Sequence, residues 1–228
     1  MRRLIAATAL ALALPPAPAV AADRVVQVGS FSRLRVEAPV EVTITTGSPR
    51  ATVSGDPRSI EGLEVGGDTG TLVVRRKSGA APVSSPLRVT LSTPALAAIA
   101  ATGGAKVDAS GLKAARVDLA LTGAGSLAVR AIDAGQVSLV VAGNGRATIA
   151  GKTGTARLTI SGAGDVDAAA LVAGDLTVSS DGAGTIGAAA RYTATIANTG
   201  SGQVTITGTP KCVIRAGSIG PVTCGKPD

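Results

Sequence analysis

The chain has 228 residues, with 22 lysine and arginine residues against 15 aspartate and glutamate residues, so its formal charge is +7. One phenylalanine, one tyrosine and no tryptophan argue against binding of single-stranded nucleic acid, which is usually held by aromatic stacking as well as by charge. The chain contains no histidine, which removes the commonest general base from any catalytic scheme.

The first 22 residues predict a secretory signal peptide. Met1-Arg2-Arg3 is a short basic segment, an apolar run follows from Leu4 to Leu14, and the small residues Ala21 and Ala22 offer a cleavage site. The apolar run is too short to span a membrane. A plain basic segment is the preferred interpretation, and a twin-arginine export signal is the alternative. We therefore expect an exported protein, in the periplasm or at the cell surface, with no transmembrane segment once the signal is removed.

Residues 23–94 predict an irregular β region that covers the first end of the fold. Apolar and polar residues alternate from Leu34 to Ile44, and residues 72–74 and 87–91 have the composition of further strands. Residues 56–62 have an aspartate cap, a proline at the first helical position and a final glycine, which predict one short helical turn. The basic run at 75–77 is interpreted as a solvated strand end, with a phosphate or lipid site as the alternative.

A six-residue unit recurs six times between Thr102 and Val204. It consists of a small or hydroxyl residue, a glycine, another small residue, usually a second glycine, a polar residue and an apolar residue. The leading glycines are 20, 20, 19, 20 and 18 residues apart, and self-similarity at a near-constant period is the mark of stacked repeats. These leading glycines are Gly103, Gly123, Gly143, Gly162, Gly182 and Gly200.

Apolar residues flank each glycine with the period-two alternation of β-strands. A strand rises about 3.3 Å per residue, so each repeat must contain two or three short strands joined by turns. Coils stacked about 4.8 Å apart would pair like strands in parallel and bury a continuous ladder of aliphatic side chains. The sequence therefore predicts an all-β parallel β-helix, or solenoid, over residues 95–228, in one structural domain with the rest of residues 23–228. The ladder four residues before the glycines is Ile99, Leu119, Leu139, Leu158, Val178 and Ile196.

Cys212 and Cys224 are the only cysteines of the chain, and they follow the last clear repeat. In an oxidising compartment two cysteines at this spacing most simply form a disulfide that pins the final coil. A redox-active pair is the alternative, although the spacing is not CxxC and no histidine is present to tune a thiolate. We expect a weaker seventh unit, from Lys211 to Cys224, to cover the second end. Exposed end strands also offer a route to oligomers.

Three short motifs imitate ligand sites but lack the required context. Residues 123–128 resemble a dinucleotide fingerprint, but a strand rather than a helix is expected to follow. Gly151-Lys152-Thr153 resembles the end of a phosphate loop, but Arg146 stands where that loop needs a glycine. Residues 164–167 resemble a calcium-binding repeat, but the other copies lack the matching aspartate, which leaves one incidental calcium contact as the alternative. We therefore predict no cofactor and no metal site.

The serious alternative to a binding protein is a carbohydrate-active enzyme, because parallel β-helices include polysaccharide lyases and hydrolases. Glycoside hydrolysis uses a pair of carboxylates on one face. The aspartates of this chain are few and occupy different positions of the repeat, and sugar-stacking aromatic residues are missing. We therefore predict a protein without catalytic residues.

The remaining candidate site is the outward surface formed three and five residues before each leading glycine. We expect the small and hydroxyl side chains at these positions to form a flat surface suited to docking an envelope protein or a surface polymer. A solvated β surface without a ligand is the alternative interpretation. We call this predicted site the docking face; it consists of Asp118, Ser138, Val140, Arg157, Thr159, Thr177 and Ser179.

The recurring Ser/Thr-Gly-Ala-Gly-polar-apolar unit, together with residues 94–99 before its first copy, resembles the putative autotransporter adhesin, head GIN domain family, a family of unknown function. The resemblance spans about Phe31 to Cys224. It implies a right-handed parallel β-helix in an exported bacterial protein, and it implies no catalytic residues, because none is established for the family. The expected function is that of a non-enzymatic, adhesin-like binding or structural module of the cell envelope.

Overall fold

The computed structural model describes residues 22–68, 70–80 and 86–225, so the predicted signal peptide lies, apart from Ala22, outside the described residues. Within those ranges the chain forms seventeen strands and one short helix. In chain order they are β1 (Ala22–Val26), β2 (Arg33–Glu37), β3 (Glu41–Thr46), β4 (Arg50–Gly55), α1 (Pro57–Glu61), β5 (Leu63–Asp68), β6 (Thr71–Arg76), β7 (Arg88–Thr93), β8 (Ala98–Thr102), β9 (Lys106–Ala109), β10 (Leu112–Gly123), β11 (Ser126–Gly143), β12 (Arg146–Gly162), β13 (Asp165–Gly182), β14 (Ile186–Asn198), β15 (Val204–Gly208), β16 (Lys211–Ile214) and β17 (Val222–Cys224).

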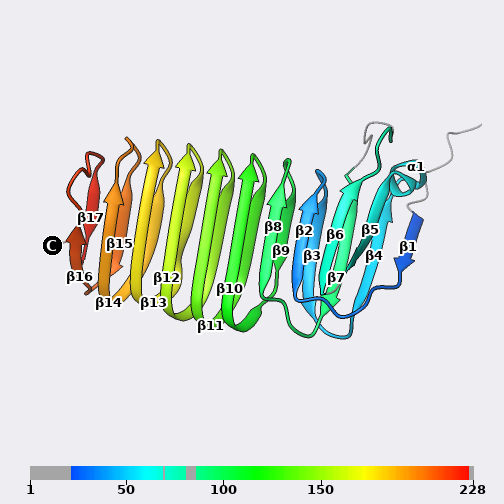
Figure 1. The fold of residues 1–228 in the computed structure, drawn as a ribbon, viewed down its shortest axis with the longest axis horizontal. Helices are drawn as coiled ribbons and strands as arrows, with labels where there is room; N and C mark the ends of the chain where they lie inside the picture. The colour runs from blue at the N-terminus through cyan, green and yellow to red at the C-terminus, as the bar shows by residue number, and fades with distance from the viewer. Residues whose placement is uncertain (1–21, 69, 81–85, 226–228) are drawn as a thin grey trace, which may run out of the picture.

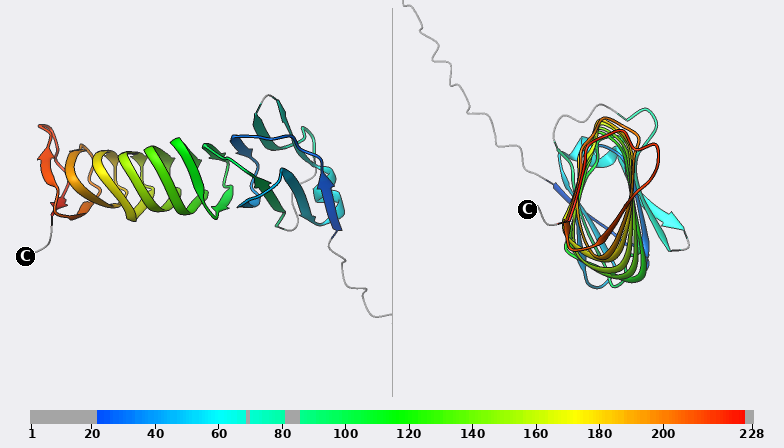
Figure 2. Two further views of the ribbon diagram at one scale, coloured as in Figure 1. Left: turned by 90° about the horizontal axis from the view of Figure 1, so that it is seen from below. Right: turned by 90° about the vertical axis from the view of Figure 1, so that its left-hand side faces the viewer.

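The chain forms a parallel β-helix, as the repeats predict, and its hand is right, as the family resemblance implies (Figure 1). Each coil contributes two strand segments. The segment before the glycine corner lies on what we call the first face, and the segment after the corner lies on the second face. The end-on view in Figure 2 shows the two faces as the long sides of a flattened tube. Strands β10 to β14 are long because the chain keeps pairing with neighbouring coils around the narrow edge opposite the glycines, at the bottom of Figure 1.

The predicted aliphatic ladder is confirmed, residue by residue. Leu119 pairs with Ile99 on one side and with Leu139 on the other, and the register continues through the later coils. All six side chains are at most 2% exposed. Full burial of such a side chain stabilises a fold by roughly 1.5–3 kcal/mol, so this ladder and its neighbours are the main source of stability.

From the third repeat onward, the glycine corners, at the top of Figure 1, are stacked so closely that a side chain would not fit. Gly143 has φ +111°, and a Cβ atom built on it would lie 2.8 Å from the carbonyl oxygen of Gly123 on the preceding coil. Glycine is needed here both for the positive φ and for the close approach of the two backbones. The interval between successive glycines in the sequence is therefore the number of residues in one coil.

One inward ladder ends in polar residues. Ser180 and Asn198 occupy the positions that Leu121, Val141 and Ile160 fill on earlier coils, and they are 1% and 0% exposed. The Asn198 Nδ2 donates hydrogen bonds to the carbonyl oxygens of Gly202, at 2.7 Å, and Pro221, at 3.3 Å. The amide therefore ties the last glycine corner and the loop before β17 to the core.

The N-terminal region adds two further coils, but it stacks them out of chain order. Strand β2 lies between β6 and β8, and β3 lies between β7 and β9, all in parallel. The chain therefore makes one coil with β2 and β3, moves past it to make the next with β6 and β7, and then crosses back to start β8. Blue strands consequently lie between cyan and green ones in Figure 1.

The first end of the β-helix is closed by antiparallel strands and α1. Strand β4 pairs with β7 and β1, and β5 pairs with β6. The predicted helical turn is confirmed, because the Asp56 side chain accepts a hydrogen bond from the Ser59 backbone N–H at 3.1 Å and Pro57 begins the helix. Ile60 and Leu63 are 5% and 3% exposed, so α1 and β5 bury apolar side chains at this end.

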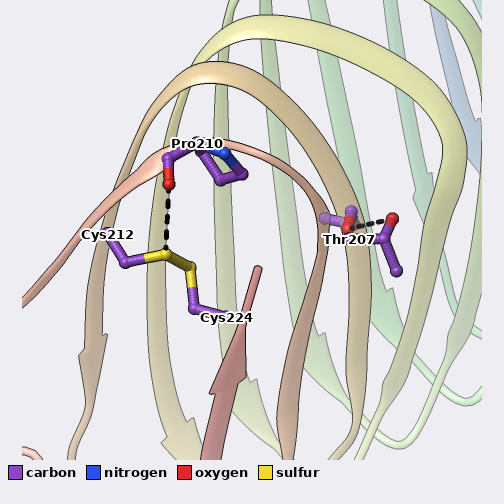
Figure 3. Close-up of a disulfide and its surroundings, with 5 residues drawn as sticks. Thr207, Pro210, Cys212 and Cys224 are labelled. Carbon is purple, nitrogen blue, oxygen red and sulfur yellow. Dashed lines mark hydrogen bonds between the residues drawn. A yellow bond between two sulfur atoms is a disulfide. The ribbon is translucent and has the colours of Figure 1, made fainter. Parts of the chain in front are cut away.

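The second end is formed by the coil of β16 and β17, which is the seventh when coils are counted from the first glycine repeat. Strand β16 pairs with β14, β17 pairs with β15, and the predicted disulfide joins Cys212 to Cys224 (Figure 3). All four residues of β16 are exposed. This coil therefore leaves part of its apolar surface in contact with solvent.

Candidate functional site

The register of the strands brings the seven residues of the docking face together on the first face. Asp118, Ser138, Arg157 and Thr177 pair in turn on β10 to β13 and form one column of outward side chains. Val140, Thr159 and Ser179 pair in turn and form a second column beside it. Their chain neighbours, such as Leu139 and Leu158, point into the core. The predicted grouping is therefore present, whereas its use as a docking site stays a prediction.

The docking face combines short side chains with a few fixed charges. The Arg116 Nε donates hydrogen bonds to the two carboxylate oxygens of Asp118, at 2.9 and 3.0 Å. Val140 is 42% exposed and begins the second column, where it pairs with Ala120 on one side and Thr159 on the other. Because most of these side chains are short, a partner would have to order few rotatable groups on binding this surface.

The docking face extends farther toward the first end than the sequence indicated. Arg33 and Arg35 pair with Ala98 and Ala100, so these two arginines continue the two outward columns. With Asp118 and Val140 they line a shallow depression of about 370 Å³. The sequence did not predict that these arginines belong to the docking face, because β2 lies far from the repeats in the chain. Their alternation with Leu34 and Val36 indicated only that they point outward.

The second face carries a different chemistry, made of ion pairs between coils. Glu41 lies 3.2 Å from the Arg88 Nε and 3.5 Å from the Lys106 Nζ, and the hydrogen bond from Arg88 is the main reason why the pKa of Glu41 is lowered. Asp165 accepts a 2.6 Å hydrogen bond from the Thr185 hydroxyl and a 3.0 Å bond from Arg146. Exposed pairs of this kind contribute little to stability.

Asp165 and Glu41 do not have the environment of a catalytic acid. A glycosidase needs one carboxyl whose pKa is raised so that it can donate a proton. The hydrogen bonds from Thr185, and then from Arg146, lower the pKa of Asp165 instead. Asp165 and Glu41 are therefore held ionised, which suits a role in pairing adjacent coils.

Within the part of the chain that the structure describes, no group of three or more carboxylate or cysteine side chains is placed to hold a metal ion. Over the same residues, no helix combines the length and the apolar character that a membrane span requires.

The family described as "Putative auto-transporter adhesin, head GIN domain" matches residues 30–210. No curated protein matches the sequence. A solved structure of a putative adhesin from Bacteroides fragilis NCTC 9343 is similar with a TM-score of 0.82 and 20% identity, covering 90% of this chain and 96% of that one. A putative lipid binding protein from Parabacteroides distasonis ATCC 8503 is similar with a TM-score of 0.70 and 17% identity, covering 91% and 97%. A putative adhesin from Parabacteroides merdae ATCC 43184 has a TM-score of 0.62 and 18% identity, covering 91% and 96%. At these identities the likeness shows a shared fold.

Proposed function

This chain belongs to the putative auto-transporter adhesin, head GIN domain family, and on that premise we propose that it is a non-enzymatic, adhesin-like binding module exported to the bacterial cell envelope. The observation that supports this proposal is the docking face, where the coil register places seven outward residues in two columns on a rigid parallel sheet. The proposed occupant is an envelope protein or a surface polymer.

The charges around the docking face favour a partner with acidic groups. Arg33 and Arg35 line the depression beside Asp118, and Arg157 lies in the same column as Asp118. Against these three arginines stand Asp118 and Glu37, and Glu37 lies 3.7 Å from Arg35. The remaining excess of positive charge attracts anionic groups such as polymer carboxylates. Arginine also binds carboxylate and phosphate oxygens through two parallel hydrogen bonds, which adds geometric specificity.

Binding assays with matched variants test the docking face. The mature protein, immobilised, is exposed to separated envelope fractions: outer-membrane proteins, peptidoglycan and surface polysaccharide. We expect Thr159→Glu with Ser179→Glu to reduce retention of the bound component at least tenfold, because both changes place negative charge on the face. The control is Thr148→Glu with Thr205→Glu on the second face, which should leave retention unchanged. Equal retention by the wild type, the docking-face variant and the second-face control would show that the docking face does not bind the retained component.

Export is the second part of the proposal, and it rests on family membership and on the predicted signal peptide. The disulfide agrees with it, because disulfides persist in oxidising compartments. Mass spectrometry of the protein purified from its native cells should give a chain that begins at residue 22 or 23. Protease treatment of intact cells then distinguishes the cell surface, where the protein is digested, from the periplasm, where it is protected. An uncleaved protein in the cytoplasmic fraction would contradict export.

A further inference from the structure

A groove lies along the narrow edge, at the bottom of Figure 1, next to the coils that are stacked out of chain order. The end of β3 and the segment that crosses from β7 to β8 form one side of it, with Ile44 from the strand and Pro94 and Leu96 from the crossing segment. The corners at which β10, β11 and β12 turn from the second face to the first form the other side. The groove has a volume of about 650 Å³, which is within the range of ligand pockets, about 300–1,000 Å³.

The groove is mostly apolar. Its lining includes Ile44, Leu96, Leu112 and Ile132, which come from four different segments of the chain and are packed into the wall, each at most 4% exposed. Ala131 and Pro94 are exposed and contribute the outer parts of the walls. An alkyl chain lying in the groove would contact the exposed Pro94 and Ala131 and the outer edges of these packed side chains. Release of water from that apolar surface is the main favourable term in binding such a chain.

The rim of the groove carries a column of charges. Lys113, Asp133 and Lys152 pair in turn on β10, β11 and β12, so their side chains follow one another along the rim. The Lys152 Nζ lies 3.8 Å from the Asp133 Oδ1, and both side chains are more than half exposed. Two ammonium groups against one carboxylate leave the rim with a net positive charge, next to an apolar surface.

A second, more polar hollow continues the groove along the same edge. It has a volume of about 380 Å³ and shares Asp133 and Lys152 with the first. Arg191 and Tyr192 lie at its far side, and the tyrosine, 67% exposed, is the most exposed aromatic residue of the described chain. Along the edge, an apolar section is therefore followed by a cationic rim and then by a polar section. An amphiphile has the same order, with an apolar chain followed by a charged or polar head group.

We propose that this edge groove binds a single-chain fatty carboxylate, with the alkyl chain in the apolar section and the carboxylate at Lys113 and Lys152. The apolar lining and the net positive rim select both parts of such a ligand. A carboxylate gains charge attraction and charge-assisted hydrogen bonds from the two lysines, a neutral head group gains only weaker hydrogen bonds, and a cationic head group is repelled. This site is separate from the docking face, which lies on the first face rather than on the narrow edge, so either proposal can fail without the other.

Titration of the mature protein with sodium dodecanoate, below its micellar concentration, tests the site by calorimetry. We expect one saturable site whose affinity rises up to about fourfold for each methylene added from octanoate to dodecanoate, the ratio that corresponds to about 0.8 kcal/mol per buried CH₂. Dodecyltrimethylammonium should bind at least tenfold more weakly. In a methyl-labelled sample, dodecanoate should shift the resonances of Leu112 and Ile132 and leave those of Leu158 in place.

Two kinds of variant separate this site from general surfactant binding. Lys113→Gln with Lys152→Gln should weaken dodecanoate at least tenfold, whereas Lys106→Gln on the second face should leave its affinity unchanged. Ala131→Phe should fill the apolar section and abolish binding, with circular dichroism verifying that the variant is folded. Absence of saturable binding, equal binding of the cationic surfactant, or unchanged affinity in the Lys113 and Lys152 double variant would each overturn the proposal.

Discussion

Cys212 and Cys224 lie on opposite faces of the seventh coil, and their disulfide spans the end of the hydrophobic core. Cys212 pairs with Ala194 and Cys224 pairs with Ile206, and both of these partners are fully buried. The two cysteines therefore extend two inward ladders, and their Cα atoms are 6.3 Å apart. The bond ties β16 to β17 at the end of the core, where β16 itself is exposed.

Removing the disulfide should loosen the last coil and leave the earlier ones intact. For a loop of 12 residues the chain-entropy account gives a loss of roughly 3 kcal/mol in the Cys212→Ala, Cys224→Ala variant. In a stacked fold each coil contacts only its neighbours, so the loss should be local. Hydrogen exchange should show lower protection in β16 and β17 and unchanged protection in β10 to β12. Reductant should reproduce this change in the wild type and have no effect on the variant.

The aliphatic ladder predicts a sharp contrast between two adjacent residues. Leu139 is fully buried between Leu119 and Leu158, whereas Val140 is 42% exposed on the docking face. Leu139→Ala should reduce the free energy of unfolding by about 2–5 kcal/mol, because it leaves a cavity in the core. Val140→Ala should change it by less than about 1 kcal/mol. Urea unfolding measures both, and equal losses would mean that the two side chains do not face opposite ways.

The glycine corners predict a second contrast, between Gly143 and Gly187. Gly143→Ala would place a methyl group 2.8 Å from the Gly123 oxygen at a φ of +111°. The backbone conformation alone costs roughly 1–2 kcal/mol for a residue with a side chain. Gly187 has open space where its Cβ would lie, so Gly187→Ala should cost less than about 1 kcal/mol. Thermal unfolding of the two variants checks this ranking. A Gly143→Ala protein that is at least as stable as the Gly187→Ala protein would contradict it.

The sequence predicted the repeats well because the physical demands of a coil recur at each copy. Glycine at the corner and an aliphatic residue four positions earlier are needed wherever one backbone packs on another, so Gly143 and Leu139 could be placed without coordinates. The order of the first coils could not be predicted. Alternation in Leu34 and Val36 shows which side chains point inward, but it does not show which strand lies next to β2.

The same limit explains what sequence analysis missed at the candidate sites. The edge groove joins Ile44, Leu96 and Ile132, which only the exchanged coil order brings together. Ser180 and Asn198 break the apolar pattern of their ladder, and the hydrogen bonds from Asn198 to Gly202 and Pro221 replace that pattern with a polar connection. The role of such a polar residue can be understood only when the carbonyl groups that accept its hydrogen bonds are known.

The seventh coil predicts self-association at its exposed end. Val213, Ile214 and Ile219 are 47%, 53% and 80% exposed, and among the residues that the structure describes β16 pairs only with β14. An unpaired strand edge beside apolar side chains favours pairing with another molecule. We expect the mass from light scattering to rise from monomer to dimer with concentration. Val213→Lys with Ile219→Lys should abolish the rise, whereas Val25→Lys on β1, at the other end, should not. A monomer at all concentrations would contradict the prediction.

The hydrogen bond between Thr185 and Asp165 predicts how the second face responds to acid. The Thr185 hydroxyl, and secondarily the Thr185 backbone N–H and Arg146, lower the pKa of Asp165 below its ordinary value of 3.8. A carboxyl with a lowered pKa stabilises the fold above the unfolded-state value, and this contribution is lost as the pH falls through the folded-state value. Thr185→Val should therefore raise the pKa of Asp165, measured by NMR titration of its carboxyl carbon, and should reduce the loss of stability on acidification. Thr205→Val, on the same face, should leave this pKa unchanged; an unaltered titration in Thr185→Val would show that the hydroxyl has no such effect.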